Sequence, residues 1–174
     1  MDLNPQSLGD DELAPFYFDY RDQVPAGDIL AFLEDQREQY TSLLTPLDEA
    51  RQRHRYAEGK WSLAEVLGHV VDIERTFSYR MMAFSRGLEE PIPGVDQDLM
   101  VANGGFDDRD WQGLVGEFAA LRTAGLLLGR GLDEAALARR GTASGYSFST
   151  RGMLVALAGH AQHHLTVMQE RYLP

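Results

Sequence analysis

The chain of 174 residues contains no cysteine. This absence excludes disulfides, cysteine-ligated zinc sites, thiolate nucleophiles and any thiol redox chemistry carried by the protein itself. The chain also lacks an apolar run of the ~20 residues that would span a bilayer. Its acidic first residues lack the basic and apolar regions of a secretory signal. These absences predict a cytoplasmic protein without a membrane partner.

Basic side chains are scarce as well. The 16 Lys and Arg residues stand against 27 Asp and Glu, which gives a formal net charge of -11. A surface with this balance repels phosphate backbones, whose neutralisation supplies much of the affinity of nucleic-acid-binding proteins. One basic cluster, residues 51–55, can be interpreted either as a nucleic-acid patch or as the solvated end of a helix, where cations suit the helix dipole. The overall charge favours the helix end, so we expect no nucleic-acid partner.

Hydrophobic residues make up 44% of the chain, enough for the core of a single domain. They recur at helical spacing in four long blocks. Pro46 ends or kinks the first block, and a shorter helical piece is expected to continue to about Tyr56. Helices are expected at residues 28–44, 62–85, 110–131 and 150–172.

The segments outside these blocks are of three kinds. Residues 88–110 contain prolines and glycines, and they exceed the ~2–8 residues of an ordinary connection in a bundle. They therefore predict a long crossover, with a short helix near Leu99. Residues 141–147 are interpreted as a polar loop. Residues 1–25 contain three prolines and no sustained period, and we expect an arm fixed to the body by its aromatic side chains: Phe16, Tyr17, Phe18 and Tyr20.

This pattern predicts an all-α protein. Four long helices without a convincing strand are typical of a four-helix bundle. The long segment between the second and third helices places a crossover there. We therefore divide the chain into an arm, residues 1–25, and a bundle domain, residues 26–174.

Four of the five histidines can be placed on faces of the helices, because a helix turns about 100° per residue. His160 and His164 are four residues apart and lie at the margin of the apolar stripe of the last helix, whereas His163 points about 100° away from His164. His69 has the same marginal position on the second helix. Neutral imidazoles are common ligands of divalent transition metals. The residues alone leave two possibilities open, a shared metal site or hydrogen-bonded histidines in the core.

Two longer segments carry a resemblance to a known family. Residues 60–80, KWSLAEVLGHVVDIERTFSYR, and residues 158–172, AGHAQHHLTVMQERY, resemble the two signatures of the DinB/YfiT-like superfamily. The resemblance implies a four-helix bundle with the same crossover and three histidine ligands, His69, His160 and His164. It also implies zinc, nickel or a similar divalent ion, and often a homodimer. Some relatives are transferases or isomerases that use a low-molecular-weight thiol.

Three histidines leave a coordination position open, which is typical of catalytic zinc. Such a metal activates water or binds and deprotonates a thiol, which here has to come from a cosubstrate. Further catalytic candidates are Glu65 and Asp72, which could orient His69 or be ordinary surface charges, and Arg80, which could bind an anionic substrate or pair with a neighbouring acid. We expect a metal-dependent enzyme that performs thiol transfer or hydrolysis on a small molecule. The alternative is a non-catalytic bundle in which the metal stabilises or senses.

Overall fold

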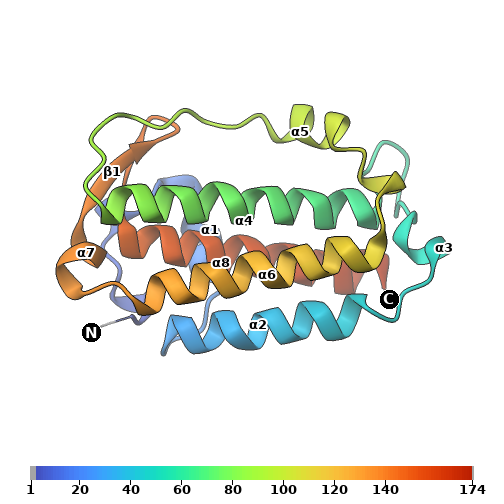
Figure 1. Ribbon diagram of the computed structural model, residues 1–174, viewed down its shortest axis with the longest axis horizontal. Coiled ribbons are helices and arrows are strands. Elements are labelled where there is room, and N and C mark those ends of the chain that lie inside the picture. The colour runs from blue at the N-terminus through green and yellow to red at the C-terminus, as the bar shows by residue number, and fades with distance from the viewer. Residues whose placement is uncertain (1–2, 174) are drawn as a thin grey trace.

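Four long helices lie side by side along the whole length of the molecule (Figure 1). The structure, a computed structural model, describes residues 3–173. Around the bundle the helices follow the order α2, α6, α4, α8, each packing against its two neighbours. Across residues 3–173, every helix is too short or too polar to cross a membrane. The expected all-α four-helix bundle is confirmed, with helices α2 (Ile29–Leu44), α4 (Leu63–Ser85), α6 (Trp111–Arg130) and α8 (Thr150–Val167), which continues as a π-helical turn over Met168–Tyr172.

The long helices begin where the sequence places a capping residue. In each case a side-chain oxygen accepts a hydrogen bond from a backbone N–H of the first turn, which otherwise lacks a partner. Glu65 completes a capping box by reaching back to the N–H of Ser62. The four caps are Asp28, Ser62, Asp110 and Ser149.

The direction of the helices requires a long crossover. Helices α2 and α8 run one way and α4 and α6 the other, so that α4 and α6 are parallel neighbours (Figure 1). Helix α4 has 23 residues and spans about 35 Å at ~1.5 Å per residue. The chain must return over that length before α6 begins. It does so through residues 86–110, which contain the expected short helix α5 (Gln97–Gly104) and a 3-10 turn, Phe106–Asp108.

A buried polar network joins the four helices near the middle of the bundle. Arg122 of α6 forms an ion pair with Glu74 of α4, and both side chains are almost completely buried. Arg122 also donates to Gln36 Oε1 of α2 at 2.6 Å, and Gln36 donates to the carbonyl of Ala158 in α8 at 3.1 Å. Such networks specify which faces meet rather than add much stability, because burying the charges is costly.

The segment predicted as a polar loop is instead a β-hairpin. Strands β1 (Arg140–Ala143) and β2 (Tyr146–Ser149) pair antiparallel. Ser144 and Gly145 both have positive φ, 53° and 82°, as two-residue hairpin turns require. Backbone hydrogen bonds join Ile92 of the crossover to Thr142 and Ser144. The strands are too short and polar to show a clear period of two.

Two further short helices flank the long ones. Helix α3 (Glu49–Gln52) ends before Tyr56, earlier than the sequence predicts, and α7 (Glu134–Ala138) precedes the hairpin.

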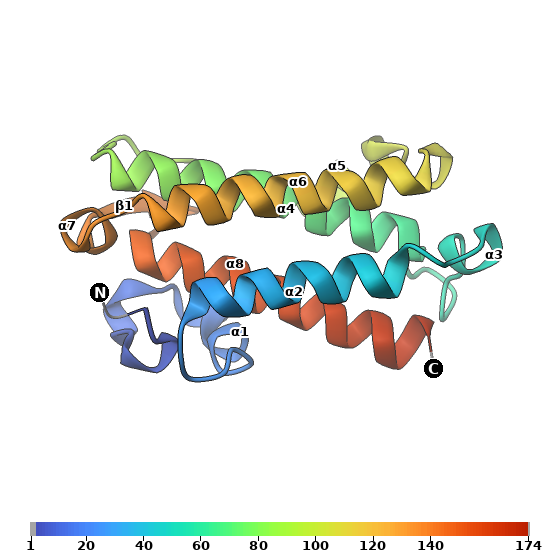
Figure 2. The same cartoon turned by 60° about the horizontal axis from the view of Figure 1, so that its bottom comes forward.

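The N-terminal residues lie along α8, on the side away from α6 (Figure 2). They form three 3-10 turns (Pro5–Ser7, Asp10–Glu12 and Pro15–Tyr17) and α1 (Phe18–Arg21). Two glycines of α8 allow the close approach. A Cβ on Gly152 would lie 2.1 Å from the carbonyl oxygen of Glu12, and one on Gly159 would lie 2.4 Å from that of Tyr20. Phe16 is 52% exposed and contacts the Tyr146 ring of the hairpin.

We predict that Gly152→Ala destabilises the protein by about 1–3 kcal/mol, because the backbone of the arm must move away from the added methyl group. The matched control is Gly116→Ala in α6, where an added Cβ meets nothing within 4 Å. This change should stabilise the protein by roughly 0.5–1 kcal/mol, since alanine favours helices. Urea unfolding of both variants measures the effects. Equal effects of the two changes would show that the close approach of the arm is absent in solution.

A second prediction concerns pH. Burial alone would raise the pKa of Glu12, but hydrogen bonds with Arg151, the Gly9 N–H and Ser149 outweigh it and lower the pKa from 4.5 to about 2. A lowered pKa stabilises the fold above the unfolded value, and this contribution is lost as pH falls through the folded value. The difference in unfolding free energy between the wild type and Glu12→Gln should therefore shrink between pH 4.5 and about 2. Glu58→Gln, at an exposed glutamate, is the control and should show a small difference throughout.

Candidate metal centre

Helices α4 and α8 bring three histidines together at their contact. His69 lies in the first half of α4, and His160 and His164 lie on successive turns of α8. One ring nitrogen from each residue falls within 4.8 Å of the other two. The Nε2 atoms of His69 and His160 are 3.0 Å apart. The structure thus groups the three residues that the sequence proposes as ligands, and we call them the histidine triad.

The triad is buried and uncharged. His69 is 3% exposed and His160 6% exposed, and His164 is half-buried. Burial lowers the pKa of His69 to about 4, with a further contribution from His163. Burial also lowers the pKa values of His160 and His164, and repulsion from the neighbouring histidines acts in the same direction. All three rings are therefore neutral at pH 7, the form in which imidazole binds a metal.

The donor set fits a divalent transition metal. Zinc–nitrogen bonds of about 2.0–2.1 Å in a tetrahedral site hold their nitrogens about 3.3 Å apart. The Nε2 atoms of His69 and His160 are 3.0 Å apart, and one ring nitrogen of His164 lies within 4.8 Å of both residues' ligand nitrogens. Three histidines of the core would be expected to satisfy each other's nitrogens. Here the Nδ1 atom of His164 is buried and has no hydrogen-bond partner within residues 3–173. The triad therefore has a ring nitrogen that is free to bind a metal, and a purely structural role does not explain this nitrogen.

His163 is turned away from this group, as its position on the helix predicts. Its ring centroid lies 5.1 Å from that of Tyr20 in α1 and 5.1 Å from that of His164. The contact on this side is therefore the N-terminal arm. Tyr20 also lies edge-on to His160, with ring centroids 5.8 Å apart, so it covers part of the triad. The sequence predicts for Tyr20 only a role in holding the arm.

Glu65 and Asp72 do not orient the triad. Glu65 accepts hydrogen bonds from the Ser62 N–H and from Arg55 at the start of α4. Asp72 forms an ion pair with Arg75, which also contacts Glu117 of α6. In the part of the chain that the structure describes, neither carboxylate hydrogen-bonds to a triad ring. The capping box and the ion pairs with arginine hold them elsewhere, which agrees with the alternative that they are ordinary charges of the helix surface.

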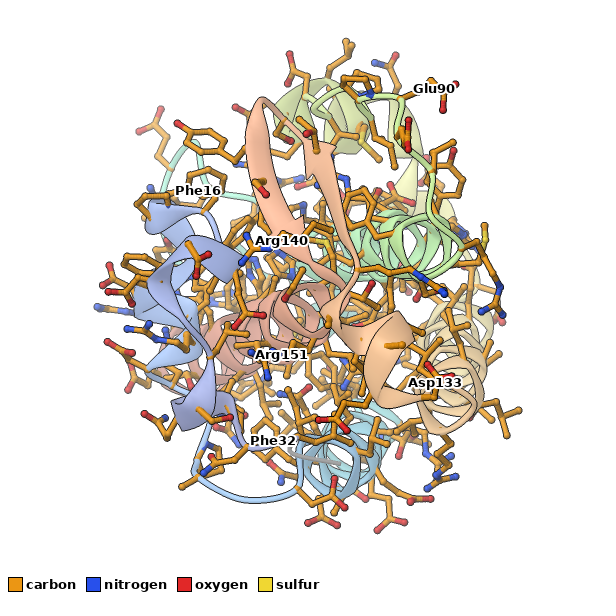
Figure 3. The ribbon with its side chains drawn as sticks, turned by 90° about the vertical axis from the view of Figure 1, so that its left-hand side faces the viewer. Phe16, Phe32, Glu90, Asp133, Arg140 and Arg151 are labelled. Carbon is orange, nitrogen blue, oxygen red and sulfur yellow. The ribbon has the colours of Figure 1, made fainter. Side chains whose placement is uncertain are left out.

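Arg80, the third catalytic candidate, lies near the triad. It is 2% exposed, and its Nη2 donates to the carbonyl of Pro93 and to Ser144 Oγ, both at 3.1 Å. With His69 and His160 it lines a cavity of about 360 Å³, which we call the Arg80 cavity. Aromatic side chains supply much of the remaining wall: Phe16, Tyr17, Tyr20 and Phe77. Figure 3 views this end of the molecule and shows Phe16, on the arm, beside the hairpin that carries Arg140.

A second cavity of about 350 Å³ reaches the triad nearer the C-terminal end of α8. Its lining includes Trp61, His163, His164 and Tyr172, and we call it the Trp61 cavity. The ring centroids of Trp61 and His69 are 5.1 Å apart. The structure places Trp61 at the cavity, and Met81 and Phe84 in the core.

Comparisons with known proteins agree with the fold. The sequence model of the DinB superfamily matches residues 32–168. The structure is similar to YfiT from Bacillus subtilis, described as a probable metal-dependent hydrolase with an unusual four-helix bundle topology, with a TM-score of 0.74, 16% sequence identity and 82% of each chain covered. It is also similar to a mycothiol-dependent maleylpyruvate isomerase, with a TM-score of 0.68, 18% identity, and 84% of this chain and 61% of that chain covered. No protein of curated function matches the sequence.

Proposed function

The chain belongs to the DinB superfamily, and on that premise we propose that it is a divalent-metal-dependent enzyme acting on a small molecule. The observation that carries the proposal is the histidine triad, with its ligand nitrogens within 4.8 Å of one another beside two cavities. His69, His160 and His164 would hold the metal, with zinc or nickel as the expected ion. The similar fold of a probable metal-dependent hydrolase supports the proposal.

A divalent ion held by three imidazoles keeps a coordination position open and supplies Lewis acidity toward water, a thiol or a substrate oxygen. The chain's own residues prepare the surroundings. Phe77, Tyr20 and Trp61 place rings beside the triad and limit the access of water. Burial raises the pKa of Tyr17 to about 12, although the Arg80 cation acts in the opposite direction. The Tyr17 hydroxyl therefore keeps its proton at neutral pH and can donate a hydrogen bond in the Arg80 cavity.

Thiol transfer is a second candidate reaction, and the Trp61 cavity is the observation that favours it. A transfer between two molecules needs space for both, and two cavities of similar size meet the triad. Because the chain has no cysteine, the thiol would be a cosubstrate of low molecular weight. The similar fold of a mycothiol-dependent isomerase supports this reaction. Hydrolysis needs only one of the cavities, and a purely structural metal needs neither. The homodimer expected from the resemblance stays a prediction.

We predict that alanine at His69, His160 or His164 weakens Zn²⁺ binding at least about 100-fold, because even changes behind a metal's ligands cost about 10–100-fold. His163→Ala is the matched control from the same helix and should bind Zn²⁺ nearly as the wild type does. Competition with a chelator of known affinity measures all four variants. If His163→Ala loses the metal while His164→Ala keeps it, the ligand assignment is wrong.

A separate prediction concerns catalysis. Metal-free protein, and protein refilled with Zn²⁺ or Ni²⁺, should be tested on simple esters and amides, and on electrophilic acceptors with and without a low-molecular-weight thiol. We expect turnover only in the refilled protein, and none in His69→Ala, because the open coordination position provides the reactivity. Turnover without thiol indicates hydrolysis, and a requirement for thiol indicates transfer. If the protein binds one metal ion per chain but turns over none of these substrates, the non-catalytic alternative is favoured.

A further inference from the structure

Two arginines of the bundle are almost completely buried, and they are satisfied in different ways. Arg122, 1% exposed, forms an ion pair with Glu74. Arg80, 2% exposed, has no ion pair with any carboxylate of residues 3–173. A buried cation without a counter-charge is costly, and such charges are ordinarily paired in native structures. The difference indicates that the negative partner of Arg80 is not among residues 3–173.

The protein holds the Arg80 guanidinium in place without neutralising it. Pro93 of the crossover and Ser144 of the hairpin both accept from Nη2. The guanidinium carbon lies 5.8 Å from the ring centroid of Phe77, and Tyr17 of the arm interacts with it electrostatically. All of these groups are neutral. The Nε atom is buried and finds no hydrogen-bond partner among the residues that the structure describes, which leaves one donor of a guanidinium fork unused.

Backbone strain at Ser144 accompanies this arrangement. Ser144 is the one residue other than glycine that has positive φ within residues 3–173, at 53°. This conformation is uncommon for a residue with a side chain and is found where the surrounding structure requires it. Glycine would make the same turn without strain, but it would remove the hydroxyl that accepts from Arg80. The serine therefore supports the position of Arg80 at some cost to the turn.

The cavity in front of Arg80 has the size and wall of a site for a small ligand. Its volume is about 360 Å³, near the lower end of the ~300–1,000 Å³ typical of ligand pockets. Tyr20, Ile73 and Phe77 give it apolar surface, and His69 and His160 of the triad complete the lining. A ligand that filled this space would contact Arg80 and the proposed metal ligands at once.

We propose that the Arg80 cavity binds a small carboxylate with an aromatic or apolar body, with the carboxylate on Arg80 and the body directed to the triad. This inference deepens the proposed function and rests on it for the chemistry at the triad. A carboxylate matches the planar fork of an arginine and is a monoanion. One arginine neutralises one such charge, which favours a carboxylate over a phosphate dianion. Arg80 is thus the specificity-determining residue of the site.

The test uses 4-fluorobenzoate as the carboxylate and 4-fluorobenzamide as its neutral counterpart, with binding followed by fluorine NMR. The metal-free protein is measured first, so that the result does not depend on a metal at the triad. We expect 4-fluorobenzoate to bind more tightly than the amide. Arg80→Gln should weaken the carboxylate roughly tenfold or more, the loss of one charge-assisted interaction, and should leave the amide nearly unchanged.

Two further variants guard against a simple loss of folding. Arg75→Gln removes an exposed arginine of the same helix, which pairs with Asp72 and Glu117, and should leave binding unchanged. Ser144→Gly keeps the turn and removes the hydroxymethyl side chain that accepts from Arg80, and it should weaken the carboxylate a few-fold. If Arg80→Gln does not fold, Ser144→Gly still decides. Equal binding of 4-fluorobenzoate to Ser144→Gly and wild type would then overturn the inference.

The same probe separates this inference from the proposed function. In protein loaded with Co²⁺, the fluorine signal of a probe bound in the Arg80 cavity should show strong paramagnetic broadening. The His163→Ala variant should show the same broadening. Carboxylate binding that depends on Arg80 in protein unable to hold metal supports the anion site and contradicts the metal-dependent enzyme. If the protein binds metal tightly but Arg80→Gln binds the carboxylate as well as the wild type does, the enzyme proposal is intact and the anion site is overturned.

Discussion

The ion pair between Arg122 and Glu74 constrains how the helices of the bundle face one another. A bundle held only by apolar stripes tolerates rotation of its helices, but a buried charge that loses its partner costs several kcal/mol, about 3–5. Arg122 connects α6 to α4, and Gln36 extends the connection from α2 to the carbonyl of Ala158 in α8. Both helices that carry the triad are therefore fixed about their axes. Turning either by one residue, about 100°, would separate the histidines.

The helices supply the triad, whereas irregular segments supply the surroundings of Arg80. The cause is the topology. Because α4 and α6 are parallel neighbours, the crossover must run back along α4 (Figure 1), and it carries Pro93 over the Arg80 side chain. The hairpin pairs with that crossover at Ile92, which brings Ser144 to the same place. The arm closes the remaining side with Tyr17, since the glycines of α8 allow it to approach. An unusual connection thus creates a cavity beside an otherwise regular bundle.

Local patterns in the sequence were sufficient for the four long helices and for the faces on which the histidines lie, whereas the shared metal site was implied only by the resemblance to the DinB/YfiT-like superfamily. The caps at Ser62 and Ser149 depend only on the next few residues, and the facing of His160, His163 and His164 follows from helical geometry. The hairpin at Ser144 could not be found in this way, because its two strands have only four residues each and are too polar to show a clear period of two. Its contact with Ile92 joins residues far apart in the sequence. Spacing also left the roles of Glu65 and Asp72 open. Spacing gives the side of the helix on which a carboxylate lies, but it does not reveal that Arg55 pairs with Glu65 and Arg75 with Asp72.

The acidic surface and a binding site for an anion are compatible because they act over different distances. The net charge of -11 is spread over the chain, and salt screens exposed charges beyond roughly 8–10 Å. Arg80 acts at contact distance, inside a wall of aromatic rings where electrostatic interactions are stronger than in water. The acidic surface and the Arg80 cavity together determine which anions bind. The surface repels polyanions in proportion to their charge, so nucleic acids and polyphosphates are disfavoured before they reach the cavity. A small monoanion meets little repulsion outside and a single unpaired cation within.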